Sequence, residues 1–208
     1  MLPHHGPVAN PADSGWHQLN DLLSTAKCGA ILAACHQLRT APETERRTGD
    51  NPYAGTHHLV LLNERIPAVS ALLRNRALLD VVTSRIGPSF ELLEASYRSP
   101  QPGYGGQKLH TDAVPKLHDG PETIATAIVA LVPFGPDNGA TRVVPGSHRR
   151  PDLQRLAGNL DHHRDEVHLT GPAGTGFVFS GHLLHSGTTN RTIAERSALQ
   201  LMWQCANT

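Results

Sequence analysis

Cysteine is scarce in this 208-residue sequence, and a long hydrophobic run is missing from it. The three cysteines, Cys28, Cys35 and Cys205, are too few and too scattered for a disulfide framework, and their odd number leaves one unpaired. A reducing compartment is the simplest setting, so we expect a cytoplasmic protein. No stretch approaches the roughly 18 apolar residues of a membrane span, and the first residues lack the basic and apolar regions of a signal peptide. We therefore expect no membrane association.

An excess of charge of either sign is also missing, because 18 lysines and arginines balance 18 aspartates and glutamates. This balance gives no electrostatic reason to expect nucleic acid as a partner and favours a small-molecule substrate. It says nothing about the oligomeric state. The length fits one domain that spans residues 1–208. Histidine, in contrast, is abundant with 14 copies, which indicates that some of them take part in chemistry.

The distribution of apolar residues changes near Pro88. Residues 17–38 and 66–86 carry apolar side chains at helical spacing, and residues 1 to about 15 read as an irregular arm. Beyond Pro88, short apolar runs separated by Gly, Pro and Asn predict strands at 90–97, 124–133, 141–144, 167–169, 176–179 and 197–203. We therefore expect a mainly helical part at 1–88, followed at 89–208 by an antiparallel β-barrel or sandwich.

The densest chemical signal is an imidazole two residues before a carboxylate, at His110 and Asp112. Residues i and i+2 of an extended segment project from the same face, so both groups can reach one metal ion. This short pattern is weak evidence by itself, because it occurs by chance in many chains.

A second signal is the segment 181–190, an apolar strand with histidines at His182 and His185. Histidines three apart on a strand face opposite sides, so at most one of them is expected to share a site with His110 and Asp112. If the chain reverses around residues 190–191, His185 and Arg196 become cross-strand neighbours on one face, which favours His185. The planar guanidinium of Arg196 then suits a carboxylate near the metal.

Two histidines and one carboxylate form the facial triad of non-haem Fe(II) oxygenases, whose open coordination positions accept other ligands. A 2-oxo acid and then O2 can occupy those positions. The other interpretation is that His185 is a hydrogen-bonded core histidine and Arg196 a surface cation. Each of these is plausible alone, but the joint pattern argues against them.

Three ordered motifs also resemble a known family. They are L-H-T-D-A-V-P at 109–115, P-D-N-G-A-T-R-V-V-P-G-S-H-R at 136–149, and H-S-G-T-T-N at 185–190 with R-S at 196–197. Over roughly residues 90–208, the sequence resembles the phytanoyl-CoA dioxygenase (PhyH-like) family of Fe(II)- and 2-oxoglutarate-dependent oxygenases. In that family the distal histidine precedes the 2-oxoglutarate-binding arginine by the separation found between His185 and Arg196.

The resemblance implies a double-stranded β-helix (jelly-roll, cupin-like) fold that uses Fe(II), 2-oxoglutarate and O2. It also implies that His110, Asp112 and His185 hold the iron and that Arg196 binds the distal carboxylate of 2-oxoglutarate. Retention of Asp112, where related halogenases have a small residue, implies hydroxylation or another oxidation of a C–H bond.

Two further residues are candidates for supporting hydrogen bonds to the cofactors. Gln107 and Thr126 fit that role, although either can equally be a satisfied polar residue of the barrel. Many 2-oxoglutarate oxygenases place a hydroxyl two residues after the arginine, but here that residue is Ala198, and Ser197 is expected on the opposite face.

The substrate is the least determined part of the prediction. Arg98, Lys108, Arg142 and His148 flank the motifs and could contact an acid or a polyol, although solvated surface charge is the favoured interpretation of each one. We predict a dioxygenase that hydroxylates or otherwise oxidises a small molecule in specialised (natural-product) metabolism. The alternatives are a cupin-type metalloenzyme that does not use 2-oxoglutarate and a non-catalytic ligand-binding barrel.

Overall fold

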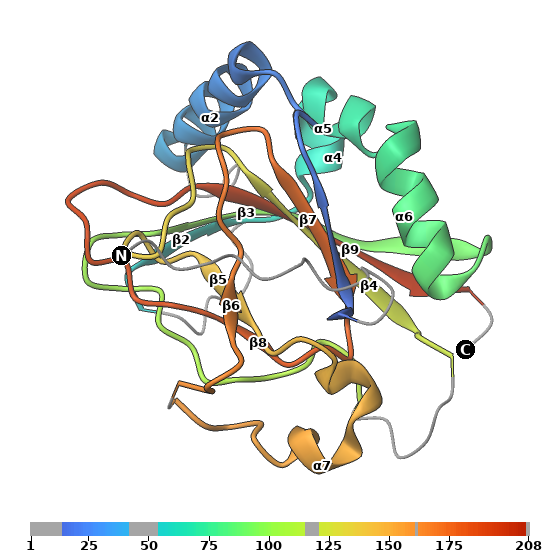
Figure 1. Cartoon of the computed structure of the whole chain (residues 1–208). Helices are drawn as coiled ribbons and strands as arrows, with labels where there is room; N and C mark the ends of the chain where they lie inside the picture. Colours follow the sequence, from blue (N-terminus) through green and yellow to red (C-terminus); the bar gives the residue numbers. More distant parts are fainter. Residues whose placement is uncertain (1–13, 42–53, 115–120, 161, 207–208) are drawn as a thin grey trace.

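Two antiparallel sheets form the frame of the protein (Figure 1). The computed structural model describes residues 14–41, 54–114, 121–160 and 162–206. The larger sheet has the strand order β1 (Trp16–Leu19), β7 (Gly176–Ser180), β4 (Ile124–Ala130), β9 (Ala198–Cys205), β3 (Phe90–Pro100) and β2 (Thr56–Leu59). The smaller sheet has the order β6 (Val167–His168), β5 (Thr141–Val143) and β8 (His185–Gly187). The prediction of a mainly β, antiparallel structure is confirmed, but the strands of the described residues do not close into a barrel.

Helices cover one face of the larger sheet (Figure 1). They are α2 (Thr25–Thr40), α4 (Leu62–Arg65), α5 (Pro67–Leu72) and α6 (Arg76–Ile86). The side chains of Ser24 and Asn75 accept hydrogen bonds from backbone N–H groups at the starts of α2 and α6, which satisfies donors that a helix leaves free. Helix α6 ends at Gly87, whose φ of 81° suits glycine. The short η1 (Ser147–Arg149) and α7 (Pro151–Gln154) lie beside the smaller sheet.

The amino-terminal part differs from its prediction in three places. The start of the helical segment predicted at 17–38 lies in β1, which pairs with β7, and the helix begins only at Thr25. The helix predicted at 66–86 is divided into α5 and α6, and β2 was not predicted. In each case long-range pairing or packing outweighs a local pattern. The six predicted strands are present with shifted ends, whereas the predicted irregular arm lies almost entirely outside the described residues.

The two faces of the larger sheet have different side chains. Odd-numbered residues of β4 and β9, such as Ala127, Val129 and Leu201, belong to the core between this sheet and the helices. Even-numbered residues, such as Thr126 and Gln200, line a cavity on the other face. Because side chains alternate along a strand, the pattern packs the apolar residues under the helices and turns polar ones toward the smaller sheet.

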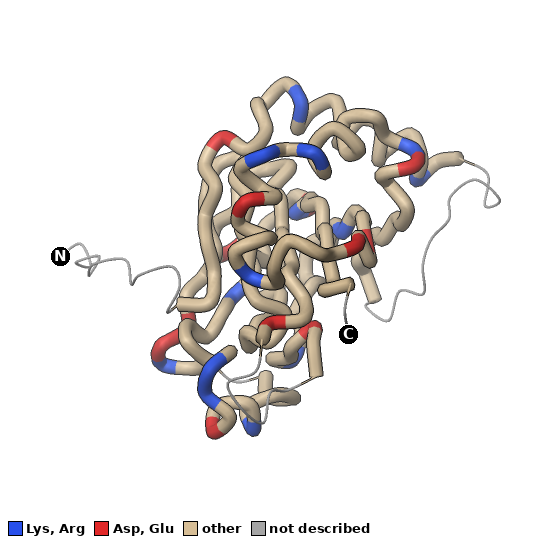
Figure 2. The backbone as a smooth tube through the Cα atoms, turned by 90° about the vertical axis from the view of Figure 1, so that its right-hand side faces the viewer, with Lys and Arg blue, Asp and Glu red and all other residues tan. Residues whose placement is uncertain are grey.

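Two further features of the structure concern the distribution of charge and the apolar length of the helices. Figure 2 shows acidic and basic residues interspersed along the chain rather than gathered by sign. Among the described helices, none is long and apolar enough to cross a membrane.

Candidate metal and cosubstrate site

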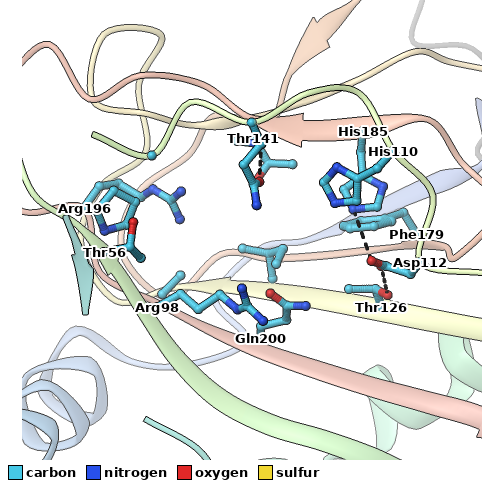
Figure 3. Close-up of a pocket in the computed structure, with 16 residues that line it drawn as sticks. Thr56, Arg98, His110, Asp112, Thr126, Thr141, Phe179, His185, Arg196 and Gln200 are labelled. Atoms are coloured by element: carbon cyan, nitrogen blue, oxygen red, sulfur yellow. Dashed lines mark hydrogen bonds and ion pairs between the residues drawn. The ribbon is translucent and has the colours of Figure 1, made fainter. Parts of the chain in front are cut away.

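A cavity of about 330 Å³ lies between the two sheets (Figure 3). Its walls include all six residues singled out in the sequence: Gln107, His110, Asp112, Thr126, His185 and Arg196. The structure therefore gathers residues that are up to 89 positions apart in the chain into one space. Gly105 also lines it, and its φ of 95° together with a close approach to Pro100 excludes a larger residue there.

Backbone pairing places the two histidines side by side. His110 and His185 exchange two N–H to carbonyl hydrogen bonds of 3.0 Å each, and their rings lie 4.4 Å apart between centroids. Asp112 approaches from the same segment as His110, and its Oδ1 lies 3.6 Å from Nε2 of His185. One ligand atom from each of the three residues lies within 4.8 Å of the others. This spacing suits three ligands on one face of a metal ion.

The ring orientations are those of metal-binding histidines. Nδ1 of His110 donates to the carbonyl of Lys108 at 2.8 Å, and Nδ1 of His185 donates to the carbonyl of Leu183 at 2.9 Å. Because Nδ1 carries the proton, the lone pair of each Nε2 is free to bind metal. Burial and the nearby His185 ring lower the pKa of His110 below its ordinary value, which favours the neutral, metal-binding form.

The carboxylate of the triad is also held in place. Thr126 on β4 donates its hydroxyl proton to Oδ2 of Asp112 at 2.6 Å. Oδ1 is the oxygen that faces His185, so the two oxygens have different partners. Thr126, predicted as a supporting residue, thus contacts a metal-ligand candidate directly.

Arg196 lies on the other side of the cavity from the triad (Figure 3). Its side chain is buried, with 6% of the residue exposed, and its Nε has no hydrogen-bond partner among the described residues. Its Cζ lies 4.7 Å from the centroid of the Phe134 ring. Burial and the charge of Arg98 lower the pKa of Arg196 to about 10, so the guanidinium is still a cation at neutral pH.

A buried cation with a free N–H group is costly unless an anion joins it. The distal carboxylate of a 2-oxo diacid would supply such an anion, and Arg196 lines the same cavity as the triad. The residues present therefore fit Fe(II) and 2-oxoglutarate together: two imidazoles, one carboxylate and a buried guanidinium line one cavity.

The route by which His185 and Arg196 come together is not the predicted one. They are not cross-strand neighbours, because β8 belongs to the smaller sheet, whereas Arg196 lies just before β9 of the larger sheet. The segment between them crosses from one sheet to the other instead of forming a hairpin. The ring of His182 contacts Val114 and Thr123 instead. The two side chains share the cavity because the sheets face each other.

Two weaker predictions can be compared with the contacts. Gln107 uses its side-chain oxygen to accept from the backbone N–H of Gly187 at 2.8 Å, which ties the first motif to β8. Ala198 lines the cavity as expected, whereas the Ser197 hydroxyl contacts Tyr97 and Ser99 away from it.

Surface charge explains only one of the four residues considered as substrate contacts. Lys108 is exposed, but Arg142 and His148 are buried, and Arg98 lines the cavity. Arg142 donates to Glu166 at 2.9 Å and to the hydroxyl of Ser186, next to His185, at 2.8 Å. It therefore supports the strand that carries His185. No local sequence pattern marks this role, since its partners are 24 and 44 residues away.

A second cluster with potential metal ligands lies outside the cavity, at His162, Glu166 and His168. Its carboxylate is already paired with the buried cation of Arg142. A divalent ion there would meet that positive charge, so the donor set of the cavity is much the better metal site.

A triad with free Nε2 atoms and an open side is the donor set of non-haem Fe(II) oxygenases. The chain belongs to the phytanoyl-CoA dioxygenase (PhyH) family, whose model matches residues 13–198. This match confirms the family resemblance of the three motifs and extends it to the amino-terminal part.

Named relatives of the chain are dioxygenases. Dioxygenase ALT11 of Alternaria alternata is 37% identical over 112 residues, which cover 51% of this chain and 35% of that protein. Multifunctional dioxygenase ausE of Emericella nidulans is 33% identical over 107 residues, which cover 46% of this chain and 35% of that protein. The matched part thus spans about a third of the length of these relatives.

Solved structures share the fold. HygX from Streptomyces hygroscopicus, with nickel, 2-oxoglutarate and hygromycin B bound, has a TM-score of 0.71 at 15% identity and covers 95% of this chain and 85% of its own. SnoN, a non-heme alpha-ketoglutarate-dependent epimerase from nogalamycin biosynthesis, has a TM-score of 0.75 at 18% identity and covers 95% and 81%. At these identities the likeness shows a common fold.

Proposed function

We propose that this chain is an Fe(II)- and 2-oxoglutarate-dependent dioxygenase that oxidises a small molecule in specialised metabolism. The observation that carries the proposal is the presence, in one cavity, of a metal-ligand triad and a buried guanidinium whose Nε has no hydrogen-bond partner in the described part of the chain. We further propose that residues 1–208 act as one domain and that the two sheets correspond to a double-stranded β-helix (jelly-roll, cupin-like) fold. The 2-oxoglutarate-dependent structural neighbours support this assignment.

In this proposal each residue has a separate task. His110, Asp112 and His185 hold the iron, and Thr126 fixes the orientation of the Asp112 carboxylate. Arg196 binds the distal carboxylate of 2-oxoglutarate through its planar fork. When bound, Fe(II) and 2-oxoglutarate supply the oxidising chemistry, in which O2 is consumed, the 2-oxo acid loses carbon dioxide to give succinate, and a C–H bond of the substrate is oxidised.

In this proposal the protein positions the reacting groups and excludes water from them. Phe179 packs its ring 4.7 Å from that of His185, and Ile128 lines the same wall, so apolar groups surround the ligand side of the cavity. Such surroundings exclude water from a reactive centre and strengthen electrostatic contacts within it.

The wall formed by the larger sheet indicates a polar substrate. Arg98 and Gln200 lie next to each other on this wall (Figure 3). Nε of Arg98 is buried without a hydrogen-bond partner among the described residues, and the side chain has one contact of 3.3 Å with Glu94. These donors favour a small substrate that offers hydrogen-bond acceptors. The structural neighbour SnoN, from nogalamycin biosynthesis, supports specialised metabolism as the proposed setting.

The two other functions fit the contacts less well. A cupin-type metalloenzyme that does not use 2-oxoglutarate has no need of a buried cation facing the metal ligands. A non-catalytic barrel has no need of two histidines whose Nε2 atoms converge with a carboxylate.

The direct test is an anaerobic optical titration of the Fe(II)-loaded protein with 2-oxoglutarate. We expect the visible charge-transfer band of a chelated 2-oxo acid, lost in His185→Ala and retained in His162→Ala. The second variant is a matched control because His162 belongs to the cluster outside the cavity. If iron binds but no band appears, the 2-oxoglutarate mechanism is wrong and the cupin-type alternative gains support.

A further inference from the structure

The position of Arg196 depends on its neighbours in the chain. Its guanidinium contacts the Phe134 ring, and its Nε has no hydrogen-bond partner among the described residues. Its backbone N–H donates to the carbonyl of Pro100 at 3.1 Å. In contrast, the residues on either side, Glu195 and Ser197, both make side-chain hydrogen bonds to other parts of the protein.

Glu195 is held by an arginine from a distant helix. Arg39, in the last turn of α2, donates from Nη1 to Oε2 of Glu195 at 2.8 Å and from Nη2 to Oε1 at 3.2 Å. This two-point geometry is the most directional that an arginine and a carboxylate can form. The side chains are only 22% and 29% exposed, so solvent screens the pair less than it would at the surface.

The pair is anchored to the large sheet as well. The Ser99 hydroxyl on β3 donates to Oε2 of Glu195 at 3.1 Å and lies 3.0 Å from the hydroxyl of Ser197. His57 on β2 accepts a hydrogen bond from Arg39. Burial alone would raise the pKa of Glu195, but the hydrogen bonds and charge of Arg39 outweigh it and lower that pKa, so the carboxylate stays ionised.

We propose that Arg39 and Glu195 are positioning residues for 2-oxoglutarate, which hold the backbone beside Arg196 so that its guanidinium faces the metal. This inference rests on the proposed function and extends it, because it makes α2 part of the cosubstrate site. No described residue gives Nε of the guanidinium a polar contact, so the fixed backbone on both sides limits where the side chain can point. A misplaced guanidinium would bind the distal carboxylate less well.

The experiment measures the dissociation constant of 2-oxoglutarate by anaerobic optical titration of the Fe(II)-loaded full chain. The variants are Arg39→Gln, Glu195→Gln and the double variant, with Arg39→Lys as a milder change. Arg76→Gln is the matched control. Arg76 also forms an ion pair with a carboxylate, at 2.9 Å from Asp80, but this pair is exposed and neither residue lines the cavity. Iron affinity and melting temperature are measured for each variant.

We expect each single variant to raise the dissociation constant of 2-oxoglutarate about tenfold, as outer groups that orient a ligand-binding residue do. The double variant should show the same increase as either single one, since both changes remove one interaction. Arg39→Lys should lie between wild type and Arg39→Gln, because it keeps the charge and loses the fork. Iron affinity should not change in any variant. The dissociation constant of 2-oxoglutarate should be the wild-type value in the control, Arg76→Gln.

The outcomes distinguish a failure of this inference from a failure of the proposed 2-oxoglutarate-dependent function. If the wild type shows no band, the 2-oxoglutarate mechanism is wrong before any variant is examined. If the wild type shows the band and the variants lose thermal stability but bind 2-oxoglutarate as wild type does, the pair is a purely structural tie and the inference is wrong. An increase that adds up across the two single variants would also contradict a shared interaction.

Discussion

The two ends of the cavity are prepared in different ways. At the metal end every candidate ligand has a hydrogen bond of its own, from His110 and His185 to backbone carbonyls and from Thr126 to Asp112. At the other end the Arg196 guanidinium rests on an aromatic ring, and its Nε has no polar partner among the described residues.

This difference indicates which kind of ligand, a cation or an anion, suits each end of the cavity. The ligands of the triad are oriented by contacts that leave one lone pair or oxygen free, so a cation completes them. The guanidinium is a buried cation in need of an anion, and Arg98 nearby increases that need. One end is therefore set for a metal and the other for a carboxylate, and variants should affect the two ends separately.

The largest effect is expected from Asp112→Asn. The amide keeps an oxygen that can accept from Thr126 but removes the negative charge that offsets the metal. We expect iron affinity to fall by at least about 100-fold, beyond the usual effect of groups around a metal site. Competition with a chromophoric iron chelator measures it. Asp152→Asn, an exposed change, is the control; equal iron affinity in the two variants would contradict the ligand role of Asp112.

Arg196→Gln tests the opposite end. Loss of the charged hydrogen bonds should raise the half-saturating concentration of 2-oxoglutarate between about 10- and 100-fold. Iron affinity should stay at the wild-type value, because the guanidinium lies across the cavity from the triad. Succinate release at graded 2-oxoglutarate concentrations gives the first quantity and chelator competition the second. A joint loss of both would show that the two ends are not independent.

The metal end could be predicted from the sequence because its geometry is local. His110 and Asp112 are two residues apart in an extended segment, and their shared face follows from the strand period. His185, and not His182, lines the cavity with them, although the hairpin used to choose His185 is not formed. The family separation between His185 and Arg196 was the more reliable guide.

At the other end the resemblance predicts Arg196, but the contacts that hold it could not be predicted, because they join distant segments. Arg39 contacts Glu195, 156 positions away, and Phe134 contacts Arg196, 62 positions away. Neither residue carries a motif. The same holds for β1, most of which lies at the start of the predicted helical pattern but pairs with β7. Local periodicity contains no information about which segments a connection brings together.

Thr126→Val sharpens the comparison at the metal end. Valine keeps the shape of threonine but cannot donate to Oδ2 of Asp112, so the carboxylate loses its orientation. We expect iron affinity to fall about tenfold while 2-oxoglutarate affinity of the iron-saturated protein changes little. Thr126→Ser keeps the hydroxyl and should stay near wild type. Unchanged iron affinity in the valine variant would remove Thr126 from the metal site.

The smallest effect is expected from Phe134→Leu. This variant tests the arginine end of the cavity as Thr126→Val tests the metal end. The ring lies 4.7 Å from Cζ of Arg196, and a contact of this kind contributes on the order of 1 kcal/mol, so 2-oxoglutarate should bind about threefold to tenfold less tightly. Phe134→Tyr keeps the ring and should bind 2-oxoglutarate as wild type does. Iron affinity should be the same in both variants. Thr126→Val, in contrast, should lower iron affinity and change 2-oxoglutarate affinity little. If Phe134→Leu lowered iron affinity as much as it weakened 2-oxoglutarate binding, the cavity would respond as one unit, and the separation of its two ends would not hold.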